Sequence, residues 1–181
     1  MAAERKTFKR CQYEFNGREM EHFRTVDEYC NYLSLLKTAL AIPIFLMVAY
    51  KKKNANKITN EVYICAIIFT VYCQIVSAFF MTFIWRSVSR YGGVNHKKVC
   101  VVSIVTIEML SIVCLCVAVY QYFTLPSEKY FKMNSAFFYC IAYEVLAIIG
   151  TVIYLKCLIN YCKELLNYCE QVDAVMWSSD I

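Results

Sequence analysis

Four polar side chains lie inside long apolar stretches of this 181-residue chain, where polar groups are rare and often functional. They are Lys37, Gln74, Glu108 and Glu144. Two carboxyl groups with an amide to orient them could relay a proton or coordinate a cation. The same groups could instead form hydrogen bonds that hold helices together, and we expect this role to be the commoner one. Which role applies depends on the helices that carry these residues and on whether those helices lie in a membrane.

The composition indicates a membrane protein. The chain is 60% hydrophobic and 18% charged, whereas soluble domains are usually about 45–50% apolar and about 25% charged. The apolar residues fall into four blocks, at about 33–50, 60–85, 99–125 and 135–157. Each reaches or approaches the roughly 20 residues that a helix needs to cross a bilayer. We therefore predict an all-α fold, an integral membrane four-helix bundle with a helical cytosolic extension of the fourth span.

The chain divides into a charged N-terminal head at 1–32, a four-span membrane domain at 33–160 and an amphipathic tail at 161–181. The head has no apolar run, so no cleavable signal peptide is expected. Apolar residues continue at spacings of three and four past the fourth block, which predicts that its helix continues into the tail. They are Leu158, Cys162, Leu165, Cys169, Val172 and Met176.

The depth of the polar residues indicates whether they can meet. A charge at mid-membrane costs at least about 2.5–3.5 kcal/mol, so Glu108 and Glu144 should face the bundle interior or be protonated. Counted from the expected cytosolic helix ends, Glu108, Gln74 and Glu144 lie about 14, 16 and 18 Å deep. Lys37 lies at about 6 Å, and its long stem could reach Glu108 if the first and third spans are neighbours. Counted from the opposite ends, Glu108 and Glu144 differ by about 12 Å, so a shared layer depends on helix register.

The 11 cysteines do not indicate a secreted disulfide framework, because several lie in the apolar blocks, where cysteine behaves as a small hydrophobe. Their spacing also lacks the CxxC pairs of a structural zinc site, so no metal is expected. Cys157, Cys162 and Cys169 are candidates for S-palmitoylation, as membrane-proximal cysteines on an amphipathic helix. Packing of the unmodified thiols is the alternative.

Charge bears on orientation and on partners. If both termini are cytosolic, the inner side holds the head, the segment 86–98 and the tail, in agreement with the positive-inside rule. The lysines at 51–57 favour the opposite orientation when the first span is considered alone. We expect both termini to be cytosolic. The net charge of +5 is expected to attract anionic lipid rather than nucleic acid. The C-terminal Ser179-Asp180-Ile181 also fits a PDZ ligand through Ser179 and Ile181.

The order of the four spans, the TLP at 124–126 and the helix YLKCLINYCKELLNYC at 154–169 carry a resemblance. In these features the chain resembles the lysosomal-associated four-span transmembrane proteins and their insect relatives of unknown function. The resemblance implies an endosomal or lysosomal membrane protein that regulates the sorting of other proteins. It implies no functional residue in this sequence.

The main functional hypothesis is a non-enzymatic membrane protein without cofactors that acts as an adaptor, a sorting factor or an accessory subunit. Its expected partners are the lipid bilayer and other membrane proteins, or further copies of itself. No phosphate loop, metalloprotease motif or Ser/His/Asp set is found, which argues against an enzyme. The alternative is a small oligomeric channel or a proton-coupled carrier that uses Glu108 and Glu144.

Overall fold

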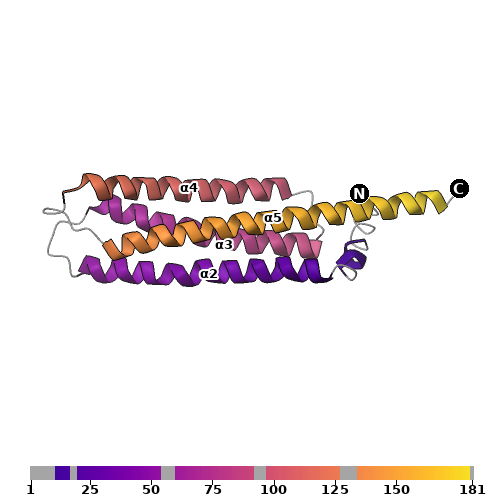
Figure 1. Cartoon of the computed structure of the whole chain (residues 1–181), viewed down its shortest axis with the longest axis horizontal. Helices are drawn as coiled ribbons and strands as arrows, with labels where there is room; N and C mark the ends of the chain where they lie inside the picture. Colours follow the sequence, from indigo (N-terminus) through magenta and orange to yellow (C-terminus); the bar gives the residue numbers. More distant parts are fainter. Residues whose placement is uncertain (1–10, 17–19, 54–59, 92–96, 127–133, 180–181) are drawn as a thin grey trace.

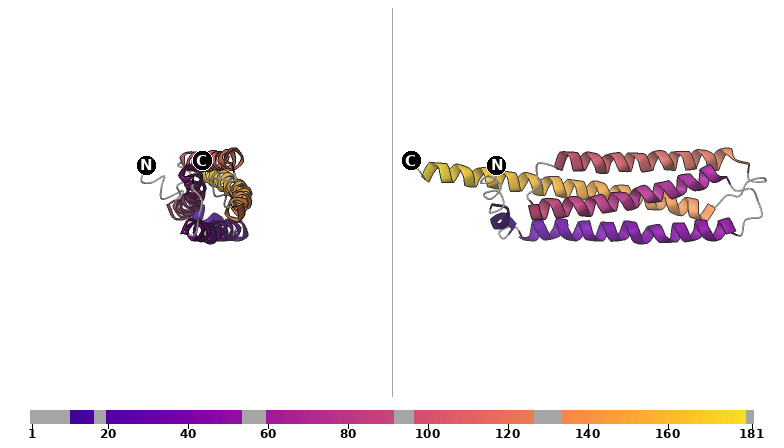
Figure 2. Two further views of the ribbon diagram at one scale, coloured as in Figure 1. Left: turned by 90° about the vertical axis from the view of Figure 1, so that its left-hand side faces the viewer. Right: turned by 180° about the vertical axis from the view of Figure 1, so that it is seen from behind.

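The computed structural model describes residues 11–16, 20–53, 60–91, 97–126 and 134–179. These residues form a short helix at 11–16 and four long helices, α2 (Met20–Lys53), α3 (Glu61–Tyr91), α4 (Lys97–Thr124) and α5 (Asn134–Ser179). Successive long helices run in opposite directions, and seen end on they surround a common axis (Figures 1 and 2). The described part of the chain is therefore an all-helical, up-and-down bundle.

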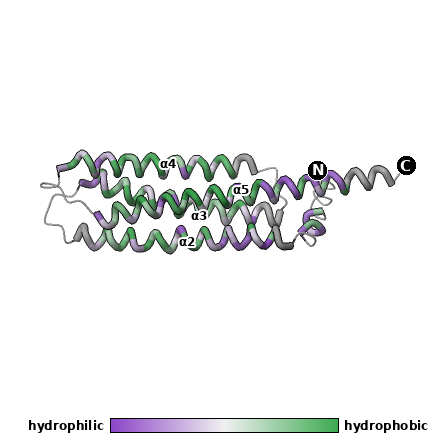
Figure 3. Tube along the Cα trace, viewed as in Figure 1, coloured by the Kyte–Doolittle hydropathy of each residue, from purple (hydrophilic) through white to green (hydrophobic). Residues whose placement is uncertain are grey.

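All four long helices are long and apolar enough to cross a membrane. The candidate spans are Phe23–Tyr50, Glu61–Ser87, Val101–Thr124 and Asn134–Val172. Figure 3 shows the apolar residues concentrated along the bundle, with isolated hydrophilic positions along the same helices. The prediction of four apolar helices is confirmed at this level.

Helix α2 begins earlier than the first apolar block, because part of the charged head is helical. Phe23, Val26, Cys30 and Leu33 recur at spacings of three and four, and the last three are buried. On the exposed side of this segment, Arg24 forms an i,i+4 ion pair with Glu28 at 2.6 Å. This segment is an amphipathic helix within the predicted charged head. The spacing of its apolar residues could have identified it as helical.

The fourth helix continues without a break as far as Ser179, as the spacing in the tail predicts. It projects beyond the other three long helices, next to the short helix 11–16 (Figure 1). Phe15 of this short helix packs against Tyr161 and Tyr168, with ring centroids 5.9 and 5.5 Å apart. Tyr161 also donates a hydrogen bond to Asn16 at 2.7 Å. The head and the tail thus pack against each other.

Two buried apolar clusters occupy the interior. The terminal cluster lies where α2 begins and consists of Cys11, Phe15, Val26, Cys30, Leu33, Met81, Ile84, Trp85, Ile104, Tyr154, Leu158, Tyr161, Cys162, Leu165 and Cys169. The distal cluster lies towards the other end and consists of Ala41, Ile44, Val48, Tyr63, Ile64, Ala66, Ile67, Val71, Ala118, Ala136, Phe137, Cys140 and Tyr143. The stretch between them contains the buried polar residues of the four long helices.

Side-chain hydrogen bonds fix how the helices meet near each cluster. Tyr154 of α5 donates to the backbone carbonyl of Met81 on α3 at 3.2 Å, and Tyr143 donates to the carbonyl of Lys37 on α2 at 2.9 Å. At the distal end, Asn60 Oδ1 accepts from the backbone N–H groups of Val62 and Tyr63 in the first turn of α3, which is the geometry of a helix N-cap. Asn60 Nδ2 also donates to Gln121 Oε1 of α4 at 3.2 Å. These contacts set the register on both sides of the interior.

Candidate functional site

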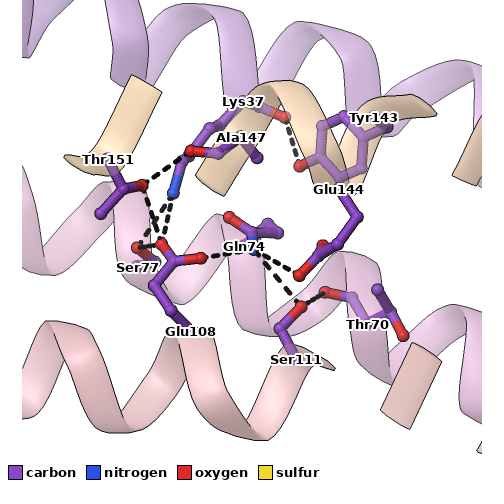
Figure 4. A network of polar contacts seen from close by, with 10 residues as sticks. All are labelled: Lys37, Thr70, Gln74, Ser77, Glu108, Ser111, Tyr143, Glu144, Ala147 and Thr151. Carbon is purple, nitrogen blue, oxygen red and sulfur yellow. Dashed lines mark hydrogen bonds and ion pairs between the residues drawn. The ribbon is translucent and has the colours of Figure 1, made fainter. Parts of the chain in front are cut away.

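A layer of buried polar side chains crosses the bundle between the two apolar clusters (Figure 4). All four long helices contribute to this polar layer, and all of its members are buried. Its members are Lys37 from α2, Thr70, Gln74 and Ser77 from α3, Glu108 and Ser111 from α4, and Glu144 and Thr151 from α5.

Glu108 is the most connected member of the polar layer. Its Oε1 accepts from Lys37 Nζ at 2.7 Å, from Ser77 Oγ at 2.6 Å and from Thr151 Oγ1 at 2.9 Å. Its Oε2 accepts from Gln74 Nε2 at 2.7 Å. Because donors face both oxygens and one of them is a cation, the surroundings of Glu108 suit an ionised carboxylate.

Gln74 connects the two carboxyl groups. Its Nε2 lies 2.7 Å from Glu108 Oε2 and 3.0 Å from Glu144 Oε1, and 3.3 Å from Ser111 Oγ. An amide turned the other way would place its oxygen against two carboxyl groups, so this orientation is the favourable one. Ser111 in turn donates its hydroxyl proton to the backbone carbonyl of Thr70 at 3.2 Å.

Glu144 has fewer hydrogen-bond donors around it than Glu108. Its Oε1 accepts from Gln74, whereas its Oε2 is buried and has no hydrogen-bond partner among the described residues. The Oε1 of Gln74 is in the same condition. The polar layer therefore combines a completed ion pair with two buried oxygens that have no donor, and such oxygens are costly.

The structure brings together all four polar residues that the sequence singled out. Lys37 does reach Glu108, and Gln74 contacts Glu108 and Glu144 directly. The first and third spans are not close neighbours, because α2 packs against α3 and α5 rather than α4, so Lys37 reaches Glu108 across the interior of the bundle. Its side chain is 1% exposed in the ion pair. The helices therefore pack in the register that places all four groups in one layer.

Sequence reasoning missed the hydroxyl members of the polar layer, although their spacing was informative. Ser77 lies three positions after Gln74, and Ser111 three positions after Glu108. Thr151 lies seven positions after Glu144. Residues at these intervals share a helix face, so a search for polar residues three, four or seven positions from each carboxyl or amide would have found them.

The three cysteines proposed for S-palmitoylation differ in accessibility. Cys162 and Cys169 are buried in the terminal cluster, while Cys157 is half-buried. In this arrangement Cys162 and Cys169 are closed off from an acyltransferase, so the geometry favours packing for these two. The expected PDZ ligand lies outside the described side chains, which include neither Ser179 nor Ile181.

Among the described residues, no three His, Cys, Asp or Glu side chains lie close enough to hold a metal ion. Comparison of the chain with models of known protein families, with curated proteins and with solved structures gave no match. The resemblance to the lysosomal-associated four-span proteins therefore stays an expectation.

Proposed function

We propose that this chain is an integral membrane protein in which α2 to α5 span the bilayer. Large apolar side chains point outward from each of these helices. Leu46 is 64% exposed, Phe79 78%, Phe123 75% and Val152 60%. Such a surface would be costly in water but suits contact with lipid tails or with other transmembrane helices.

The activity that we propose is non-enzymatic, as an adaptor, a sorting factor or an accessory subunit that binds other membrane proteins. One observation carries this proposal: the polar layer bonds mainly within itself and lies between two apolar clusters. One helical turn to one side lie Leu33, Met81, Ile104 and Tyr154, and to the other side lie Ala41, Val71 and Cys140. These neighbours separate the layer from both ends of the bundle. Such an arrangement suits a hydrogen-bond network that holds the helices together and does not suit a water-filled path.

The location that we propose is an endosomal, lysosomal or plasma membrane, with both termini in the cytosol. The same end of the bundle carries the start of α2 and the end of α5 (Figure 1). The charge distribution supports a cytosolic placement of this end, apart from the lysines that follow α2.

A second candidate, a proton-coupled carrier or small channel, is favoured by the two buried oxygens without donors on Gln74 and Glu144. A transport site needs groups that can bind and release an ion, and an incompletely bonded carboxyl is such a group.

Flux through liposomes separates the two candidates. We expect liposomes that contain the wild-type protein to leak protons and alkali cations no faster than protein-free liposomes under an imposed gradient. The variants Glu108→Gln and Glu144→Gln should be as inactive, and Glu61→Gln, at an exposed helix start, is the matched control. A wild-type flux that either layer variant abolishes and Glu61→Gln retains would overturn the adaptor proposal.

A further inference from the structure

We propose that Glu144 is a proton-binding site, and that the folded bundle holds Glu144 as a neutral acid beside an ionised Glu108. This inference deepens the proposed function, because it rests on the placement of the bundle in a membrane. It assigns different chemical states to two residues of the same type in one layer.

The hydrogen bonds of the two residues differ in the way that different charge states require. Glu108 is contacted by donors from Lys37, Ser77, Thr151 and Gln74, which together serve both of its oxygens. Glu144 is approached by the amide of Gln74 and by the hydroxyl of Ser111, whose proton also lies towards the carbonyl of Thr70, and the Oε2 of Glu144 has no hydrogen-bond partner among the described residues. An ionised carboxylate in apolar surroundings needs several donors, whereas a neutral acid needs far fewer.

The charges around Glu144 lead to the same assignment. The titratable groups around Glu144 are Lys37 on α2, Cys73 on α3, Glu108 and Cys114 on α4, and Cys140 and Tyr143 on α5. Lys37 is the one cation in this set, and its amine is already paired with Glu108 at 2.7 Å. A proton on Glu144 makes the polar layer electrically neutral, while its loss leaves one buried negative charge without a partner.

A proton suits this site better than a metal ion. The hard cations that proteins bind through oxygen usually take six or more ligands. The polar layer offers two oxygens without a donor, Glu144 Oε2 and Gln74 Oε1. One proton on the carboxyl removes the charge and turns one of these two acceptors into a donor.

Infrared spectroscopy tests the assignment on the intact protein. In an ester-free detergent at neutral pH, we expect the wild type to show a carboxylic-acid C=O band above the amide I band. Glutamate labelled with ¹³C at its side-chain carboxyl should shift this band to lower frequency. The band should be lost in Glu144→Gln and kept in Glu61→Gln, the control at an exposed carboxyl. Absence of the band from the wild type, or its persistence in Glu144→Gln, would overturn the proposal.

Stability provides the second measurement, because glutamine has nearly the shape of a neutral glutamic acid. Titration with sodium dodecyl sulfate, followed by loss of helical circular dichroism, should give Glu144→Gln the same midpoint as the wild type. Glu108→Gln, which removes an ionised partner of Lys37, should unfold at a clearly lower detergent fraction. If Glu144→Gln failed to fold or lost as much stability as Glu108→Gln, the neutral state of Glu144 would be excluded. Flux tests the proposed function independently, so either proposal can fail while the other stands.

Discussion

Glu108 and Lys37 illustrate how context determines the cost of a buried charge. Their ion pair is enclosed between helices, with side chains that are 9% and 1% exposed. Removing both charges of such a pair is often tolerated, whereas removing one leaves the other buried and unpaired. The pair therefore predicts strong non-additivity between substitutions.

We expect Glu108→Gln to lower the free energy of unfolding by about 3 kcal/mol or more, because the Lys37 ammonium then lacks a counter-charge. The double variant Lys37→Met with Glu108→Gln should recover a large part of this loss, since it contains no buried cation. Unfolding in mixed micelles, followed by circular dichroism, measures both. Additive losses in the double variant would show that the charge pair is not the source of the effect.

At the scale of elements, α2 and α5 approach closely at Gly150. A Cβ built on Gly150 would lie 2.5 Å from Leu33 Cδ1, too close for real atoms unless Leu33 moves. Small residues commonly permit such approaches between transmembrane helices. The polar layer depends on this approach, because Thr151 follows directly and Lys37 lies one turn from Leu33.

A graded response at Gly150 is the expected outcome. Gly150→Ala should cost little, since the end of the Leu33 side chain can turn away. Gly150→Leu should destabilise the bundle by about 1–3 kcal/mol through overpacking. The combination of Gly150→Leu with Leu33→Ala should restore stability towards the wild-type value. Unfolding midpoints of the four proteins provide the check, and equal losses for Ala and Leu would contradict a steric cause.

The contact between the short helix 11–16 and the α5 extension joins the two ends of the chain. Phe15 is buried against Tyr161 and Tyr168, and the thiols of Cys162 and Cys169 lie in the same cluster. A buried thiol reacts with an alkylating reagent only when its surroundings open.

We therefore expect Phe15→Ala to raise the maleimide reactivity of Cys162 and Cys169 at least severalfold, because it leaves a cavity in the buried cluster that contains both thiols. Phe79→Ala, at an outward-facing side chain on α3, is the control and should leave their reactivity unchanged. Mass spectrometry of the α5 peptides after brief labelling gives both rates. Rapid labelling of Cys162 and Cys169 in the wild type would contradict the packed arrangement. It would also show that both thiols are accessible to S-palmitoylation.

At the scale of the whole molecule, four antiparallel helices place the start of α2 and the end of α5 at one end of the bundle (Figure 2). The positive-inside rule then assigns a side to this end as a unit. The lysines that follow α2 are the main opposing signal, so the orientation is worth a direct measurement.

Reporter fusions measure the orientation. We expect tags at both termini to be accessible only after the membrane is permeabilised, because the end of the bundle with more Lys and Arg residues stays in the cytosol. An N-glycosylation acceptor on a longer insert between α4 and α5 should be modified, and the same insert between α3 and α4 should not. The reverse pattern would show that the lysines after α2 dominate.

The sequence alone determined the number and position of the long helices, because apolar length and helical spacing are local properties. It also marked Lys37, Gln74, Glu108 and Glu144, because each is conspicuous against apolar neighbours. The early start of α2 was missed, since charges on its exposed face obscured the buried one.

Only the tertiary structure decided which of these side chains meet and how. Helix register depends on contacts between distant segments, such as Leu33 against Gly150 and Tyr143 against the carbonyl of Lys37. A shift of one turn would move a side chain by about 5.4 Å, more than a hydrogen bond can bridge. The difference between the fully bonded Glu108 and the poorly bonded Glu144 therefore arises from packing between helices, and no single stretch of the sequence contains it.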